Sequence, residues 1–149
     1  MTLYEKLNSD MLSAMKEHDK DTLSTIRLLK SAIDLQRINS KLPEITDELV
    51  IEVASRQVKQ HKESIEEFRN AGRNDLADAL VREISVISAY LPEQLTEEEI
   101  VIEIDKIFAE INPSGKQDMG KIMKEANARL KGKADFKLVS EIVNKKLDM

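Results

Sequence analysis

Tyr90-Leu91-Pro92-Glu93-Gln94-Leu95-Thr96-Glu97-Glu98-Glu99 contains both a helix stop and a helix start. Proline lacks the backbone N–H that a helix interior needs and restricts the residue before it, so the preceding helix must end near Pro92. Thr96 followed by Glu99 is the pattern of a capping box, in which each side chain accepts a hydrogen bond from the other residue's backbone. A new helix is therefore expected directly after Thr96.

Four helices are expected on the N-terminal side of this stretch, because apolar residues recur there at helical spacing. Their stripes are Leu3, Leu7, Met11 and Ala14; Leu23, Ile26, Leu29 and Ile33; Ile51, Ala54, Val58, His61, Ile65 and Phe68; and Leu76, Leu80, Ile84, Ile87 and Leu91. The candidate N-caps are Thr2 (in a capping box with Glu5), Asp19 or Asp21, Thr46 or Asp47, and Asn74. The third stripe has heptad-like spacing and is expected to pack within the chain.

Three shorter helices are expected on the C-terminal side. Their stripes are Ile100, Ile104, Ile107 and Ile111; Met119, Met123, Ala126 and Leu130; and Val139, Ile142, Val143 and Leu147. Asp135 is the candidate cap of the last helix. The sequence therefore predicts an all-α protein: an N-terminal four-helix region at residues 1–92, joined by a proline-containing linker to a C-terminal three-helix bundle at residues 93–149.

The composition excludes several classes of chemistry. The 149 residues are 41% hydrophobic and 34% charged, with 3% aromatic residues and no cysteine. The lack of cysteine excludes disulfides, thiol nucleophiles, iron–sulfur clusters and cysteine-ligated zinc. The longest uncharged run, Ile84 to Pro92, is far shorter than the roughly twenty residues of a membrane-spanning helix. The N-terminal residues lack a signal-peptide pattern, so a cytoplasmic location and no membrane partner are expected.

No catalytic residue, metal or cofactor is predicted from the sequence motifs. His18 and His61 lie outside any nucleophile motif, and neither has the glutamate three positions earlier that a di-iron site requires. His61 is interpreted as a boundary residue with one ring nitrogen satisfied, in preference to a catalytic or switching group. The run Glu97–Glu99 is interpreted as the first turn of a helix, where acids complement the helix dipole. Glycine-rich nucleotide-binding motifs are absent.

The C-terminal region is basic in an otherwise acidic chain. Residues 114–149 hold nine bases and five acids, a net charge of +4 (9 − 5), whereas the whole chain carries −5. A glycine in a lysine-rich turn lets backbone N–H groups approach a phosphate, and the following helix N-terminus favours an anion. Because Phe136 is the one aromatic residue nearby, backbone or shape recognition of a folded RNA is expected. The alternative is a solvated helix face. The candidate RNA-binding residues are Lys121, Lys124, Arg129, Lys131, Gly132, Lys133 and Lys137.

Several longer blocks resemble the YqeY-like proteins of the GatB/YqeY family over essentially the whole chain. The blocks are Lys59–Ser64, Phe68–Leu76, Tyr90–Leu95, Asp118–Met123 and Leu130–Asp135. Two positions depart from the family pattern: His61 stands where arginine is more frequent, and Phe136 where glycine is common. The first departure weakens any role for His61 as a shared catalytic histidine.

The family is similar to the tail of the GatB component of the glutamyl-/aspartyl-tRNA amidotransferase, which amidates mischarged tRNA with glutamine as nitrogen donor. The matching segments are Gly120–Lys124, Lys131–Ala134 and Lys137–Val139. In that enzyme the tail helps hold tRNA, while the kinase and transamidation chemistry lies in a separate domain and the glutaminase in another polypeptide. The resemblance therefore implies an association with carbon–nitrogen ligase activity but supplies no active site here.

Three functions follow as hypotheses. The first is a module that docks tRNA, or a tRNA-bound amidotransferase complex, through the C-terminal lysines; Gly120 would permit close helix packing and Gly132 close backbone approach. The second is direct participation in amide transfer as an accessory subunit. The third is a protein-interaction adaptor, which uses the stripe of the third helix or the face at Arg69–Asp75 of the N-terminal region.

Overall fold

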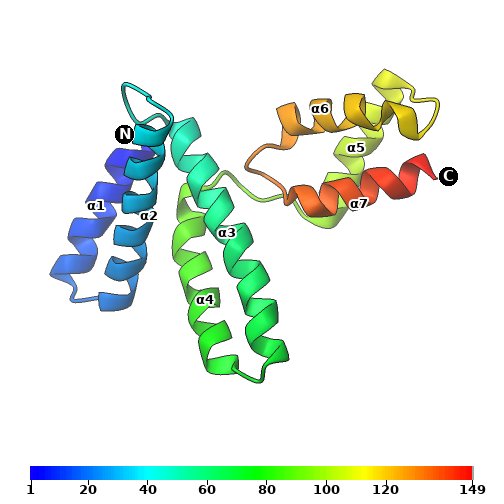
Figure 1. The fold of residues 1–149 in the computed structure, drawn as a ribbon. Coiled ribbons are helices and arrows are strands. Elements are labelled where there is room, and N and C mark those ends of the chain that lie inside the picture. Colours follow the sequence, from blue (N-terminus) through cyan, green and yellow to red (C-terminus); the bar gives the residue numbers. More distant parts are fainter. Residues whose placement is uncertain (149) are drawn as a thin grey trace. The chain divides into compact units, whose positions relative to one another are not determined.

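Helices form all of the regular secondary structure of residues 1–148, which a computed structural model describes (Figure 1). The α-helices are α1 (Leu3–Lys16), α2 (Lys20–Asn39), α3 (Asp47–Asn70), α4 (Asn74–Ile87), α5 (Glu97–Ile111), α6 (Met119–Leu130) and α7 (Phe136–Leu147). Two short 3-10 turns, η1 (Ser88–Tyr90) and η2 (Lys116–Asp118), precede α5 and α6. No strand occurs among these residues, so the all-helical prediction is confirmed.

The helices divide into two compact units, Met1–Pro92 and Glu93–Met149. The first unit contains α1 to α4 with η1, and the second contains α5 to α7 with η2. Each unit has its own cluster of buried side chains. That each unit is a domain able to fold by itself stays a prediction.

The first unit consists of two helical hairpins, α1 with α2 and α3 with α4 (Figure 1). Its buried core is formed by Leu7, Ile26, Leu29, Ile33, Leu49, Val50, Val53, Ala54, Ile87 and Tyr90. The stripe expected on the third helix is only partly correct. The buried residues of α3 all lie in its first two turns, while Val58, His61, Ile65 and Phe68 are half-buried. The C-terminal half of α3 lies beside α4 in the second hairpin (Figure 1). The side chains of this half are less completely buried than those of the first two turns.

Side-chain caps start five of the helices at residues that the sequence predicts. Thr2 accepts a hydrogen bond from the Glu5 N–H at 3.1 Å, and Asp19 is the cap used by α2. Thr46 caps α3, and Asp135 caps α7. The fifth helix has the full capping box, with both Thr96–Glu99 bonds at 3.2 Å.

The predicted cap and end of the fourth helix are wrong. The residue before α4 is Arg73, which makes no side-chain cap, and Asn74 is already helical. The reason is that the Asn74 Oδ1 accepts a hydrogen bond from Arg69 instead, at 3.4 Å. The helix also ends at Ile87, and the turn η1 fills the distance to Pro92.

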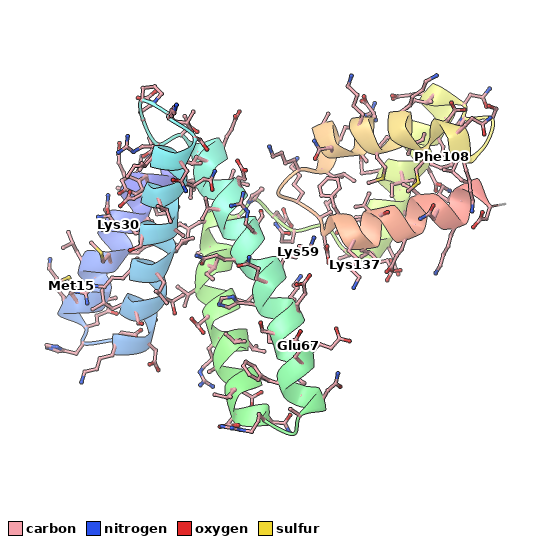
Figure 2. The ribbon with its side chains drawn as sticks, in the orientation of Figure 1. Met15, Lys30, Lys59, Glu67, Phe108 and Lys137 are labelled. Atoms are coloured by element: carbon pink, nitrogen blue, oxygen red, sulfur yellow. The ribbon has the colours of Figure 1, made fainter. Side chains whose placement is uncertain are left out.

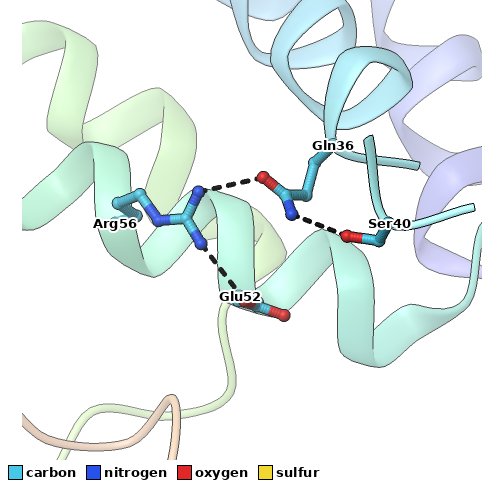
Figure 3. Close-up of polar contacts among 4 residues, drawn as sticks. All are labelled: Gln36, Ser40, Glu52 and Arg56. Atoms are coloured by element: carbon cyan, nitrogen blue, oxygen red, sulfur yellow. Dashed lines mark hydrogen bonds and ion pairs between the residues drawn. The ribbon is translucent and has the colours of Figure 1, made fainter. Parts of the chain in front are cut away.

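A polar contact set joins α2 to α3 across the loop between them (Figure 3). The Arg56 guanidinium donates to Gln36 at 3.2 Å and to Glu52 at 3.1 Å. Gln36 in turn donates to the Ser40 hydroxyl at 2.8 Å. These bonds fix the C-terminal end of α2 against α3.

Two tyrosines connect α1 with later segments of the same unit. The Tyr90 hydroxyl donates to Asp10 at 2.6 Å, and the Tyr4 hydroxyl donates to Asp34 at 2.8 Å. Lys6 donates to the Ala89 carbonyl at 3.0 Å, and its ammonium lies 5.3 Å from the Tyr90 ring centroid. Burial and the Asp34 carboxylate raise the pKa of Tyr4 to about 12.

The second unit is a three-helix assembly around an aliphatic core. Its buried residues are Ile100, Ile104, Ile107, Ile122, Ala126, Leu130, Val139, Ile142 and Val143. The fifth helix ends where Asn112 adopts a left-handed conformation, with φ of 52°. Ser114 then donates its N–H to Asp118 at 2.8 Å, which shapes the turn before α6.

Candidate nucleic-acid interface

The turn between α6 and α7 carries two of the candidate lysines. Gly132 has φ of 78°, a left-handed conformation that glycine adopts without steric cost. Its carbonyl accepts a hydrogen bond from the Gln94 side chain at 2.6 Å, and the Lys133 carbonyl accepts one from the Leu95 N–H at 2.9 Å. The backbone of the turn is therefore held in place, while the side chains of Lys131 and Lys133 are exposed.

The N-terminus of α7 already has a carboxylate. Asp135 caps this helix and accepts a hydrogen bond from the Lys137 N–H at 3.0 Å. Asp135 therefore already places a negative charge at the helix end that was expected to favour an anion. The Lys137 side chain is exposed in the first turn of α7 (Figure 2). A phosphate near this end would meet the Lys137 side chain and also the carboxylate of Asp135.

Two further lysines lie along α6. Lys121 and Lys124 are exposed and three residues apart, so they share a helix face. At about 1.5 Å rise per residue, Lys121 lies roughly 15 Å along the helix direction from Lys131. The Lys121 Nζ is 3.7 Å from the Asp118 carboxylate, whose pKa is lowered mainly by hydrogen bonds from Ser114. The candidate lysines therefore form a group at the α6–α7 turn and a pair on α6.

Four of these lysines have no acidic partner. Within residues 1–148, no carboxylate lies at ion-pair distance from the ammonium groups of Lys124, Lys131, Lys133 and Lys137. The lysine ion pairs of the second unit use other residues, such as Lys106 and Lys116. Four positive charges on exposed side chains are therefore available to an external anion.

Arg129 differs from these lysines because its charge is already paired. The guanidinium donates to Glu125 on its own helix at 2.8 Å and to Glu110 at the end of α5. The two carboxylates raise the pKa of Arg129, with Glu110 having the larger effect. The pairing joins α6 to α5, which is a structural role that the sequence pattern did not reveal.

The role expected for Gly120 is also wrong. Gly120 is exposed in the first turn of α6, and a Cβ atom built there would meet no atom within 4 Å. A glycine at a close helix contact would leave no such space. Close packing therefore does not explain this residue.

Acidic residues border the basic turn, which sequence reasoning missed. The Leu95 N–H is hydrogen-bonded to the Lys133 carbonyl. The start of α5, with Glu97, Glu98 and Glu99, therefore lies close to the turn between α6 and α7. These segments are far apart in the sequence, so only the tertiary structure brings them together.

The two histidines lie at separate places in the first unit. His18 is an exposed residue with φ of 56° between α1 and α2. His61 on α3 is half-buried. Its Nε2 lies 3.8 Å from a carboxylate oxygen of Glu83 on α4, which is too far for a hydrogen bond, so this nitrogen has no hydrogen-bond partner. Residues 1–148 contain no group of three or more histidine, aspartate or glutamate side chains able to hold a metal ion. No helix in this part of the chain is long and apolar enough to cross a membrane.

Comparison with known proteins identifies relatives across the chain. The model of the family described as Yqey-like protein matches residues 4–147. The "Altered inheritance of mitochondria protein 41, mitochondrial" of Pyrenophora tritici-repentis is 33% identical over 143 residues, which are 95% of this chain and 77% of that protein. An uncharacterized protein of Schizosaccharomyces pombe is 36% identical over 87 residues, 58% of this chain and 70% of its own.

The names of these relatives correct the expected location. A protein of Lachancea thermotolerans with the same mitochondrial name is 30% identical over 110 residues, 72% of this chain and 59% of its own. The cytoplasmic expectation rested on the lack of a signal-peptide pattern, and the relatives named as mitochondrial proteins contradict it. The family match and the identity across most of both chains show that the chain belongs to the family of YqeY-like proteins.

Proposed function

We propose that the chain binds the phosphate backbone of a folded RNA, with tRNA as the first candidate. The proposed contacts are Lys121, Lys124, Lys131, Lys133 and Lys137, with Gly132 allowing the turn between them. The observation that carries the proposal is the set of four exposed lysines without an acidic partner, in a chain whose net charge is −5. When exposed lysines neutralise phosphates, the counterions condensed on the RNA are released. This release favours binding without sequence specificity.

The surroundings of these lysines favour backbone recognition over base recognition. Unpaired bases stack mainly on exposed aromatic rings, and also on arginine guanidinium planes. Phe136, the aromatic residue beside the lysines, packs against the core of the second unit. We therefore propose that RNA shape and charge are recognised, and that Arg129 supports the fold instead of contacting phosphate.

The resemblance to the amidotransferase tail supports tRNA as the RNA. We propose that the chain is an accessory module of glutamine-dependent carbon–nitrogen ligase activity and has no catalytic site of its own. If it takes part in transamidation, adding it to a purified amidotransferase should increase the amidation of Glu-tRNA or Asp-tRNA. No increase would contradict this part of the proposal and leave RNA binding to be tested by itself.

The direct test is a titration of labelled bulk tRNA with the full chain at several salt concentrations. About four phosphate contacts predict that log affinity falls with log salt at a slope of roughly −3 to −4. The Lys131→Glu/Lys133→Glu double variant should lose binding. The matched control is Lys59→Glu/Lys62→Glu, which makes the same charge change at two exposed positions of α3. Equal loss in both variants, or unchanged binding in the first, would reject the site.

The alternative proposal is an adaptor that binds a protein through the N-terminal helical region. The face at Arg69–Asp75 is a weak candidate, because Arg69 pairs with Asp78 at 3.1 Å and Arg73 with Asp75 at 3.2 Å. An exposed apolar face on α2 is the observation that favours the adaptor.

A further inference from the structure

The outward face of α2 is apolar although it contacts solvent. Leu28, Leu35 and Ile38 are 61%, 59% and 60% exposed, more than any other large hydrophobic side chain of residues 1–148 except Met1. The opposite face of the same helix forms part of the core, through Ile26, Leu29 and Ile33. A helix that is apolar on two faces is typical of one that is covered on both.

The exposed face has the spacing of large and small side chains that is typical of a surface packed against another helix. Ser24, Leu28, Ser31, Leu35 and Ile38 follow one another at intervals of four, three, four and three residues, the spacing of a heptad seam. The two serines leave a groove of about 300 Å³, lined by Lys20, Leu23, Ser24, Arg27, Leu28 and Ser31. Large side chains of a second helix fit above the serines, between the leucines.

Charge along the edges indicates the chemistry of that second helix. Lys20 and Arg27 follow one edge of the face, and no carboxylate of residues 1–148 lies at ion-pair distance from either cation. Asp34, the acid further along this edge, accepts the Tyr4 hydroxyl. Asp21 lies at the N-terminal end of the face, three residues before Ser24. A second helix with acidic residues along one edge would complement the two free cations.

The same charges disfavour a second copy of this chain. Two α2 helices packed antiparallel bring the same edge of each copy together. Lys20 and Arg27 of one copy would then meet the basic edge of the other, whose one acid, Asp34, already accepts the Tyr4 hydroxyl. Parallel packing would bring each Asp21 close to its equivalent. Parallel packing therefore provides no carboxylate for Arg27, and antiparallel packing provides two cations with only one carboxylate, which is already hydrogen-bonded.

We propose that the outward face of α2 binds an amphipathic α-helix of a partner protein, one with a leucine- or isoleucine-rich stripe bordered by acidic residues. The leucines and Ile38 contact the stripe, the serines accommodate its large side chains, and Lys20 and Arg27 pair with its acids. The inference deepens the adaptor alternative and is independent of RNA binding, which uses the other unit.

The test uses two synthetic helical peptides, each about three heptads long, with the same leucine stripe. One has glutamate along one edge of the stripe and the other has lysine there. Fluorescence anisotropy with the full chain should show that the glutamate peptide binds at least about tenfold more tightly, a difference of about 1.4 kcal/mol. Leu35→Asn should abolish binding. Val81→Asn, at a hydrophobic residue of α4 that is 46% exposed, should not.

The Lys20→Glu/Arg27→Glu variant should reverse the preference between the two peptides. These side chains lie on the surface, and circular dichroism should confirm that each variant stays folded. Equal binding of both peptides, or binding of neither, would overturn the proposal. Self-association in analytical ultracentrifugation that Leu35→Asn abolishes would identify a second copy as the occupant and would also overturn it. Unchanged tRNA binding in these variants keeps the two functions separable.

Discussion

The backbone N–H of Leu95 donates a hydrogen bond of 2.9 Å to the carbonyl of Lys133. The neighbouring Gln94 side chain donates to the Gly132 carbonyl at 2.6 Å. The segment that leads into α5 is thereby bonded to the loop between α6 and α7. The bond also sets the position of the lysine turn, because it fixes the turn's backbone against the start of the three-helix unit.

Replacing Gly132 with alanine should destabilise the second unit. Gly132 has φ of 78°, and an L-residue in the left-handed region costs roughly 1–2 kcal/mol. Thermal unfolding followed by circular dichroism should show a lower midpoint. The matched control is Gly120→Ala, which meets no atom within 4 Å and lies in a helix. The control should stabilise the protein by up to about 1 kcal/mol. Equal effects of the two substitutions would contradict this explanation of Gly132.

Alkaline pH should weaken the first unit through Tyr4. The pKa of Tyr4 is raised from 10.0 to about 12, so the folded state favours the protonated hydroxyl. This contribution is fully present below pH 10 and is lost as the pH rises towards 12, because the unfolded chain releases the proton first. Urea unfolding at a series of pH values should show the loss.

The Tyr4→Phe variant separates this effect from the rest of the alkaline titration. It should be less stable than the original chain at neutral pH, because the bond to Asp34 is gone. Its stability should fall less steeply between pH 10 and 12. Tyr90, whose pKa is also raised by burial and by Asp10, retains its own dependence in both proteins. Parallel curves for the two proteins would show that Tyr4 does not contribute.

Arg129 should affect stability and leave RNA affinity unchanged. Its guanidinium bonds to Glu125 and Glu110, so Arg129→Gln removes the ion pairs that join α6 to α5. We expect a lower thermal midpoint and an unchanged salt slope in the tRNA titration. A smaller slope for Arg129→Gln would mean that the guanidinium leaves its acids to contact phosphate.

The sequence predicted the helices well because each helix's core face and most caps are local features. The pattern of isoleucines in α5 and the Thr96–Glu99 box are examples, and both appear as expected. The cap of α4 was predicted wrongly because Asn74 bonds to Arg69, a contact that depends on how α3 and α4 pack. Local patterns do not contain such contacts.

The exposure of the candidate lysines follows from helical spacing, but their electrostatic surroundings do not. Arg129 looks like a member of the basic group in the sequence, and only the packing of α5 against α6 pairs it with Glu110. The hydrogen bond between the Leu95 N–H and the Lys133 carbonyl brings the acids Glu97–Glu99 close to Lys133. The apolar face of α2 was also missed, because the core stripe of the same helix accounted for its periodicity.

The unit Glu93–Met149 should fold without the first unit. Its core cluster draws only on α5, α6, α7 and their flanking residues, and its first loop is bonded to its last through Leu95 and Lys133. Domains of about 60 residues bury a smaller share of their surface and are correspondingly marginal. We therefore expect a cooperative but low thermal transition for the isolated fragment.

A shorter fragment tests whether the hydrogen bonds of Gln94 and Leu95 contribute to the stability of the second unit. A fragment that begins at Thr96 lacks the Gln94 and Leu95 bonds to the α6–α7 loop but keeps every helix of the unit. It should unfold at a lower temperature than the longer fragment. If the two fragments melt together, the closing bonds add nothing measurable. If neither melts cooperatively, the second unit depends on the first and is not a domain.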